Sequence, residues 1–224
     1  MESKLDHRVR YLQIAFNYDA GLVQRVLPTI PRHDRILVEA GTPYIKREGM
    51  RGVALMRSLW SGHVVADMKV TDGAELEVRM AAQAGADAVT VYGNSPPETL
   101  NLFIDACRRN NVISMVDLLA VEDPLAVMRP LHNPPDVAVI HRGRDEEGTQ
   151  GKTIQYRQVN RIRSKYDVII SAARGVDLKD ARSAIFNGSN IVVVNLVRPG
   201  DPWQGISTQD DIASIARTFL ETIE

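Results

Sequence analysis

Asp67, Lys69 and Asp72 form a D-x-K-x-x-D pattern at the end of an apolar run, His63–Lys69. Side chains two residues apart in a β-strand project from the same face, so Asp67 and Lys69 are predicted to point the same way. Asp72 lies just past this strand, where it can reach a neighbouring subunit or cap the helix predicted to begin near Gly73. The pattern indicates either a reactive acid–amine pair or a structural ion pair followed by a helix cap.

Glu39 closes another apolar run, Ile36–Glu39. If this run and the run that ends with Asp67 and Lys69 form neighbouring strands, two carboxylates at adjacent strand ends can hold a divalent cation. Oxygen ligands favour Mg²⁺, which keeps several waters and completes its shell from the substrate. The alternative is that Lys69 simply neutralises Glu39.

His141 ends the apolar run Val137–His141 and is followed by Arg142 and Arg144. A neutral imidazole at a strand end suits acid–base catalysis near pH 7, and neighbouring arginines suit a sugar phosphate or an oxyanion. The alternative is a hydrogen-bonded structural histidine. Polar residues also end other predicted strands, and these are Asn17, Asp117 and Asn195.

Eight β-branched apolar runs recur along the chain, and their starts lie about 23–30 residues apart. This spacing suits a repeated unit of strand, loop, helix and loop. Continuous apolarity is typical of strands that are buried on both faces of a parallel sheet. The predicted strands are Tyr11–Phe16, Ile36–Glu39, His63–Lys69, Ala88–Tyr92, Val112–Leu118, Val137–His141, Asp167–Ser171 and Asn190–Asn195.

Helical patterns lie between these runs, and the predicted helices are Ala74–Ala84, Pro97–Arg108, Asp177–Phe186 and Thr208–Ile223. Eight strands that alternate with helices predict an α/β protein with a single (β/α)₈ TIM barrel over residues 1–224. The main rival is an open doubly wound sheet. The barrel is favoured because the eighth unit is complete and no dinucleotide-binding glycine pattern follows the first strand. In such a barrel the active site lies at the carboxyl ends of the strands.

Composition narrows the function classes. The chain has 224 residues, with 27 Lys and Arg against 28 Asp and Glu, and a formal net charge of −1. This balance argues against binding to nucleic acid or to an anionic membrane surface. The single cysteine, Cys107, argues against disulfides and a cysteine-rich zinc site, and favours a reducing, cytoplasmic compartment. No apolar run is long enough to span a bilayer, and the first residues lack the apolar core of a secretory signal.

Four segments carry a family resemblance, and they are Val38–Met50 (VEAGTPYIKREGM), Val65–Lys69 (VADMK), Ala84–Asp87 (AGAD) and Val116–Leu118 (VDL). Together with His141, they resemble the 3-hexulose-6-phosphate synthase group of the orotidine 5′-monophosphate decarboxylase suprafamily. That suprafamily also contains 3-keto-L-gulonate 6-phosphate decarboxylase. The resemblance runs from about Leu12 to Val194, which is most of the chain.

The resemblance implies a Mg²⁺-dependent reaction through the 1,2-enediolate of a ketose phosphate. In the synthase, ribulose 5-phosphate loses a C1 proton and the enediolate attacks formaldehyde. The resemblance assigns Mg²⁺ to Glu39 and Asp67, and proton transfer to His141. It assigns stabilisation of the enediolate to Lys69, and it implies a homodimer in which Asp72 reaches the partner's active site. A Schiff base at Lys69 is the chemical alternative, although a neighbouring carboxylate would keep the amine charged.

Three positions depart from the family pattern. Asn17 stands where the family has Asp, Arg174 and Gly175 stand where it has a Gly-Gly pair, and the segment from Asn195 to Arg198 replaces a Gly-Arg pair. The arginines could compensate as charged forks for a phosphate, or the pocket could be reshaped for another ligand. Substrate contacts are expected from Asn17, Arg144, Arg174, Gly175 and Arg198.

Three functions therefore stay open from the sequence. The leading interpretation is a Mg²⁺-dependent aldehyde-lyase of the hexulose-phosphate synthase kind. The second is a related sugar-phosphate decarboxylase or epimerase that uses the same enediolate machinery. The third is a barrel that binds a metabolite without turning it over, and the altered loops motivate it.

Overall fold

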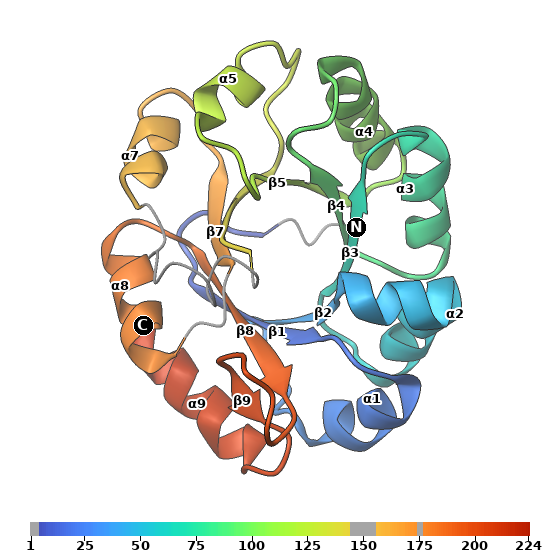
Figure 1. Ribbon diagram of the computed structural model, residues 1–224, viewed down its shortest axis with the longest axis vertical. Helices are drawn as coiled ribbons and strands as arrows, with labels where there is room; N and C mark the ends of the chain where they lie inside the picture. Colours follow the sequence, from blue (N-terminus) through green and yellow to red (C-terminus); the bar gives the residue numbers. More distant parts are fainter. Residues whose placement is uncertain (1–4, 144–155, 174–176) are drawn as a thin grey trace.

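In the described part of the chain, eight short strands form a parallel sheet that closes on itself (Figure 1). β1 pairs with β2 on one side and with β8 on the other, and this double pairing closes the barrel. The computed structural model describes residues 5–143, 156–173 and 177–224. The strands are β1 (Tyr11–Phe16), β2 (Ile36–Ala40), β3 (Val64–Val70), β4 (Ala88–Tyr92), β5 (Ile113–Asp117), β6 (Val137–His141), β7 (Ile169–Ala173) and β8 (Ile191–Val197).

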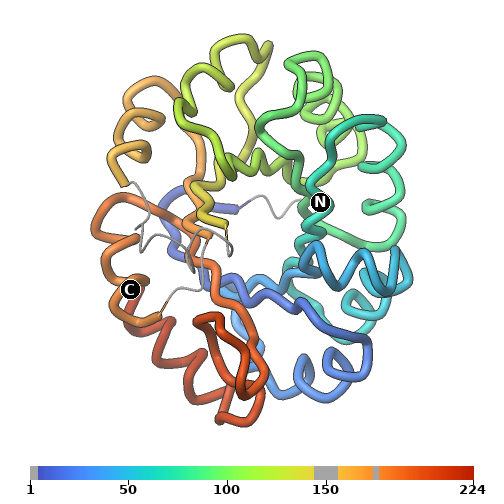
Figure 2. Tube along the Cα trace, viewed as in Figure 1, coloured from blue at the N-terminus to red at the C-terminus, as the bar shows by residue number. Residues whose placement is uncertain are grey.

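Helices surround the barrel and cover the outer face of its strands, and the tube in Figure 2 follows the same closed path. The described helices are α1 (Ala20–Val26), η1 (Leu27–Thr29), α2 (Thr42–Leu59), α3 (Ala74–Gln83), α4 (Pro97–Arg109), α5 (Pro124–Met128), α7 (Arg157–Arg163), α8 (Leu178–Phe186) and α9 (Ile212–Thr222). None of these helices combines the length and apolar character that crossing a membrane requires. The predicted α/β class and (β/α)₈ TIM barrel are confirmed. The alternative prediction of an open doubly wound sheet is wrong, because β1 pairs with β8.

The predicted elements differ from the observed ones mainly at their ends. The helix predicted from Thr208 begins at Ile212, and the strand predicted from Asp167 begins at Ile169. The longest described helix, α2, was not predicted. Gly49 has a φ of 61° inside it, and this kink interrupts the regular spacing of apolar residues that marks a helix.

The interior of the barrel changes from apolar to polar along its axis. Leu37, Val65 and Met115 belong to an apolar cluster that fills the interior. Nearer the carboxyl ends of the strands, Asp67 and Asp117 are also buried. A buried carboxylate is unfavourable unless other groups pair with it, so this end of the barrel must contain compensating partners.

β3 is irregular where its polar residues lie. Ala66 pairs with Val89 and Val70 pairs with Val91, so β3 advances four residues while β4 advances two. Lys69 lies within this bulge and has a φ of 46°, in the left-handed region that residues other than glycine rarely adopt. The bulge therefore redirects the segment that carries the D-x-K pattern.

A further short strand, β9 (Ile206–Ser207), pairs with the end of β8 through Leu196 and Val197. The sequence did not predict it. Gly205 precedes it, and a Cβ at this position would lie 2.1 Å from the carbonyl oxygen of Asn195. This contact explains why the chain has glycine where it returns to the rim of the barrel.

Gly85 gives a stability prediction. It has a φ of 92°, and an added Cβ would lie 2.5 Å from Cγ of Arg57, whose guanidinium is fixed by an ion pair with Asp87 at 2.8 Å. We predict that Gly85→Ala lowers the free energy of unfolding by about 3 kcal/mol, because backbone strain and a steric clash combine.

Gly73→Ala is the matched control for this prediction. Gly73 also has a positive φ, of 61°, but an added Cβ would have nothing within 4 Å. Its cost should be about 1 kcal/mol, from backbone strain alone. Urea denaturation measures both variants, and equal losses would show that the contact with Arg57 has no role.

Candidate active site

The carboxyl ends of the strands surround a cavity of about 310 Å³. The lining includes the four residues predicted to share a reactive site, and these are Glu39, Asp67, Lys69 and His141. Asn17, predicted to contact substrate, lines the same cavity. Parallel strands explain this meeting, because their carboxyl ends all lie at one rim of the closed sheet.

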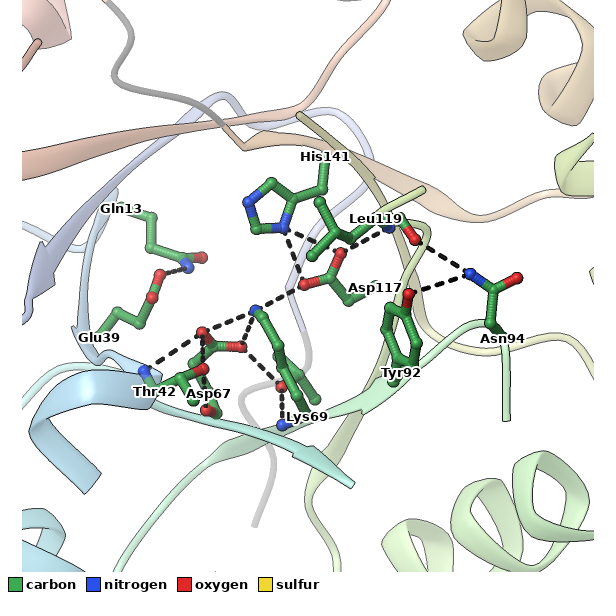
Figure 3. A network of polar contacts seen from close by, with 11 residues as sticks. Gln13, Glu39, Thr42, Asp67, Lys69, Tyr92, Asn94, Asp117, Leu119 and His141 are labelled. Carbon is green, nitrogen blue, oxygen red and sulfur yellow. Dashed lines mark hydrogen bonds and ion pairs between the residues drawn. The ribbon is translucent and has the colours of Figure 1, made fainter. Parts of the chain in front are cut away.

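Lys69 lies between two carboxylates. Its Nζ is 2.9 and 2.8 Å from the two Asp67 oxygens and 2.7 Å from Asp117 Oδ2 (Figure 3). Burial lowers the pKa of Lys69, but the charges and hydrogen bonds of Asp67 and Asp117 raise it by more, and the net pKa lies above its ordinary value. Lys69 is therefore an ammonium at neutral pH, which does not suit a Schiff base.

Asp117, at the end of β5, connects Lys69 to His141. Its two carboxylate oxygens lie 3.0 and 2.8 Å from His141 Nδ1. Burial raises the pKa of Asp117, but His141 and Lys69 hold it far below its ordinary value. Burial lowers the pKa of His141, yet the charge of Asp117 and the hydrogen bond to it raise it above its ordinary value. The contact orients the ring through Nδ1, and Nε2 points away from Asp117 (Figure 3).

Two threonine hydroxyls complete the surroundings of Asp67. Thr42 Oγ1, at the start of α2, lies 2.7 Å from Asp67 Oδ2. Thr90 Oγ1, on β4, lies 2.8 Å from Asp67 Oδ1. Lys69 contacts both carboxylate oxygens, and the Thr42 N–H lies 3.4 Å from Oδ2. These contacts restrain the orientation of Asp67. A carboxylate has about four acceptor sites, so a cation that bound Asp67 would have to replace one of these contacts.

Glu39 has different surroundings from Asp67. Its Oε2 accepts a hydrogen bond of 2.5 Å from Gln13 Nε2. Burial raises the pKa of Glu39 to about 7, and the charge of Asp67 contributes in the same direction against the opposing effect of Gln13. Lys69 directs its described ion pairs to Asp67 and Asp117, and its charge only partly offsets the raised pKa of Glu39.

Glu39 lies outside the ion pairs of this rim. Lys69 pairs with Asp67 and Asp117, and His141 pairs with Asp117. Ionised Glu39 adds a negative charge in a buried position, and a bound cation would compensate for it. The carboxylates of Glu39 and Asp67 are hard oxygen donors, which fit Mg²⁺.

In the described residues, no group of three or more His, Cys, Asp or Glu side chains could hold a metal ion. Mg²⁺ can bind through one or two carboxylates and take its other ligands from water and substrate, so a pair of carboxylates is compatible with it.

The remaining predicted site residues have different positions. Asn17 Nδ2 donates to Asn195 Oδ1 at 3.1 Å. Arg198 forms an ion pair of 2.5 Å with Asp19 and lies over the ring of Tyr18, 4.5 Å from its centroid. Arg198, which follows β8, therefore packs against the β1–α1 loop, and it is not among the residues that line the cavity. Three predicted substrate contacts lie outside the described residues, and they are Arg144, Arg174 and Gly175.

Asp72 is exposed and follows β3. Its Oδ1 accepts a hydrogen bond of 2.8 Å from the Gly73 N–H, but Gly73 is the N-cap residue of α3. The helix cap that the sequence left open for Asp72 is therefore not formed. Its position leaves the carboxylate accessible to another molecule.

Sequence reasoning gave no role to four residues of this network. Asp117 was recognised only as a polar residue at a strand end, and Thr42 is part of the E-A-G-T-P segment. Gln13 and Thr90 each interrupt an otherwise apolar strand, in YLQIAF and AVTVY. A single polar residue within a buried strand is the signal that could have found them, because such a residue needs a partner.

The fold and the cavity together define a (β/α)₈ barrel with a charged site at the rim where barrel enzymes bind their substrates. Residues 11–195 match the Orotidine 5′-phosphate decarboxylase / HUMPS family. The chain belongs to this family, and the resemblance inferred from its motifs is confirmed.

Similar proteins cover most of this chain. The Bifunctional enzyme Fae/Hps of Methanothrix thermoacetophila is 35% identical over 216 residues, which are 96% of this chain and 53% of that protein. The protein of the same name from Methanosarcina barkeri is 33% identical over 215 residues, which are 95% of this chain and 52% of that protein. The chain thus spans about half the length of the curated relatives it matches.

Solved structures share the fold. A crystal structure of 3-hexulose-6-phosphate synthase is 27% identical, with a TM-score of 0.76 over 96% of this chain and 100% of that chain. The synthase from Salmonella typhimurium has a TM-score of 0.83 at 24% identity, over 95% of this chain and 98% of that chain. At 24% identity, the similarity to the Salmonella typhimurium structure shows a shared fold.

The contact between Asp117 and His141 predicts a measurable change in protonation. We expect His141 in the wild type to titrate above its ordinary value of 6.5. Asp117→Asn should lower its pKa below that value, because burial remains and the attracting charge is lost. NMR titration of the imidazole measures both values, and Asp105→Asn, which removes an exposed acid on α4, is the control.

The same pKa shift predicts how stability depends on pH. A raised folded-state pKa means that protonated His141 stabilises the fold fully below about pH 6.5, and this contribution is lost as pH rises through the folded value. The difference in free energy of unfolding between wild type and Asp117→Asn should therefore shrink above that pH. A difference that grows with pH would contradict the proposed pairing.

Proposed function

We propose that this chain is a Mg²⁺-dependent aldehyde-lyase that joins ribulose 5-phosphate to formaldehyde, in the manner of 3-hexulose-6-phosphate synthase. The observation that carries the proposal is the Lys69 ammonium, held between Asp67 and Asp117 beside His141 at the rim of the barrel. Two similarities support the proposal. A Fae/Hps protein matches 96% of this chain, and a structure of 3-hexulose-6-phosphate synthase also matches 96% of it.

His141 is the proposed proton-transfer residue. Asp117 binds Nδ1, which leaves Nε2 as the nitrogen that exchanges a proton with C1 of the ketose phosphate. Loss of this proton places negative charge on the substrate oxygens. The Lys69 ammonium, which lines the same cavity, stabilises that charge without changing its own protonation.

Glu39 and Asp67 are the proposed ligands of Mg²⁺. When bound, Mg²⁺ supplies further positive charge next to the substrate oxygens on which negative charge develops. Gln13 orients Glu39 through its 2.5 Å hydrogen bond, and Thr42 and Thr90 orient Asp67. The protein therefore fixes both carboxylates before the cation and the substrate arrive.

The proposed contacts for the sugar phosphate are Asn17, Arg144, Arg174, Gly175 and Arg198. Arg198 would have to exchange its ion pair with Asp19 for one with the phosphate. The other partner is a small aldehyde. We propose no nucleic-acid or membrane partner and a cytoplasmic location, and the buried free thiol of Cys107 supports the latter.

A second candidate function is a sugar-phosphate decarboxylase or epimerase that uses the same enediolate chemistry. Arg142, buried and next to His141, lines the cavity and favours this candidate. An arginine at this position could hold a carboxylate or an oxyanion of the substrate. The products distinguish the two candidates, because only the synthase consumes formaldehyde.

We also propose a homodimer with shared active sites. Asp72 is exposed just before α3, and α3 itself exposes Leu76 (54%) and Met80 (41%). These two residues are four apart on the helix and therefore share a face. An exposed apolar face beside a carboxylate suits a second copy of the chain, which would receive Asp72 in its cavity.

The activity prediction uses proton exchange as its readout. In D₂O with Mg²⁺ and without formaldehyde, the chain should exchange the C1 proton of ribulose 5-phosphate, and NMR follows the loss of signal. His141→Asn should slow the exchange by about 10²–10⁴-fold, because proton transfer loses its acid–base group. His132→Asn, an exposed histidine before β6, is the matched control and should exchange normally.

Three outcomes separate the candidates. Exchange followed by consumption of formaldehyde supports the synthase. Exchange without consumption of formaldehyde favours the decarboxylase or epimerase. If the wild type binds the sugar phosphate but shows no exchange, and Asp67→Asn binds it equally well, the chain is a metabolite-binding barrel and the proposed activity is wrong.

Mixing two inactive variants tests the shared site. Asp72→Asn and Lys69→Ala should each be inactive as homodimers. In a mixed dimer, the Asp72→Asn chain keeps its own Lys69 and receives Asp72 from its partner, so one of two sites is complete. An equal mixture contains about half mixed dimers and should regain about a quarter of wild-type activity. No recovery after verified subunit exchange would contradict the role of Asp72.

A further inference from the structure

Thr90 occupies the point where the bulge in β3 meets β4. Lys69 has a φ of 46°, and the register between the two strands shifts around it. Its N–H therefore lacks the carbonyl partner of a regular ladder, and it donates instead to Thr90 Oγ1 at 2.9 Å. Thr90 is 5% exposed, so this N–H would otherwise be buried beside an apolar strand.

The same hydroxyl also binds Asp67. Thr90 Oγ1 lies 2.8 Å from Asp67 Oδ1. A hydroxyl has one proton, and Thr90 Oγ1 already accepts the hydrogen bond from the Lys69 N–H. An ionised carboxylate can only accept, so the Thr90 hydroxyl donates its proton to Asp67 Oδ1. One side chain thus fixes the backbone of the lysine and the carboxylate of the acid.

This double contact determines how the acid and the amine meet. Asp67 and Lys69 are two residues apart in β3, and the Lys69 Nζ lies within 3 Å of both Asp67 oxygens, at 2.9 and 2.8 Å. The bulge brings Asp67 and Lys69 together. Lys69 also reaches across β4 to Asp117, which lies on β5. Thr90, on the strand between them, holds the bulge that makes this reach possible.

We propose that Thr90 is a positioning residue for the reaction, which acts by holding the Lys69 N–H and the Asp67 carboxylate in one geometry. The proposal rests on the proposed enediolate chemistry, because that chemistry gives Asp67 and Lys69 their roles. Thr90 transfers no proton to the substrate and need not touch it. A merely structural Thr90 would affect the stability of the barrel but not the rate of the chemical step.

Two pairs of variants isolate the hydroxyl. Wild type and Thr90→Val differ by a hydroxyl replaced with a methyl group, and Thr90→Ser and Thr90→Ala differ by a hydroxyl alone. In each pair, the member without the hydroxyl should have a kcat about 100-fold lower, with KM for ribulose 5-phosphate changed by about threefold or less. Thr90→Ser should keep most of the wild-type kcat. Thr99→Val, a buried threonine on α4, is the control for the same chemical change elsewhere and should keep full activity.

Hydrogen exchange of the Lys69 amide, followed by NMR, gives a readout that does not depend on the reaction. The amide should exchange slowly in wild type and Thr90→Ser, and at least about tenfold faster in Thr90→Val and Thr90→Ala, because its acceptor is lost. If Thr90→Val does not fold, the Ser and Ala pair carries the comparison.

The experiments distinguish failure of the positioning role of Thr90 from failure of the proposed synthase function. A wild type without C1 proton exchange would show that the proposed substrate is wrong, and the amide exchange and a crystal structure of Thr90→Val would then decide the role of Thr90. Equal kcat within either pair, a loss confined to KM, or an unchanged Lys69 amide would overturn the proposal.

Discussion

The site depends on one ammonium group that is shared by two buried carboxylates. Asp117 is 2% exposed and Asp67 is 12% exposed in their side chains, and a buried carboxylate is unfavourable unless a cation pairs with it. Lys69 contacts both, and the imidazole of His141 pairs with Asp117. Glu39 lies outside these ion pairs, and burial raises its pKa to about 7.

The barrel supplies the positions, and a local irregularity supplies the contacts. A closed parallel sheet brings the ends of β2, β3, β5 and β6 to one rim. A regular β3 would not let Lys69 contact both Asp67 on its own strand and Asp117 on β5. The bulge at Lys69 does so, and β4 stabilises it through a side chain instead of a carbonyl group. Strain in the backbone is thus located where the charged groups must converge.

The sequence is sufficient to predict the barrel and the main acid, amine and imidazole groups. Continuous apolar runs separated by helices favour a closed parallel sheet, and Glu39, Asp67 and His141 are recognisable because they end such runs. Thr90 could not be assigned in this way, since its role depends on the register of two strands. The ion pair of Arg198 could not be predicted either, because its partner Asp19 is 179 residues away in the chain.

Neutron diffraction from a deuterated crystal tests the central claim most directly, because it locates the protons of the network. The account predicts three deuterons on Lys69 Nζ, a deuteron on His141 Nδ1 directed at Asp117, and none on the carboxylates of Asp67 and Asp117. A deuteron on Asp117, or a neutral amine at Lys69, would contradict it. In that case the charges that the site is proposed to offer to an enediolate would not exist.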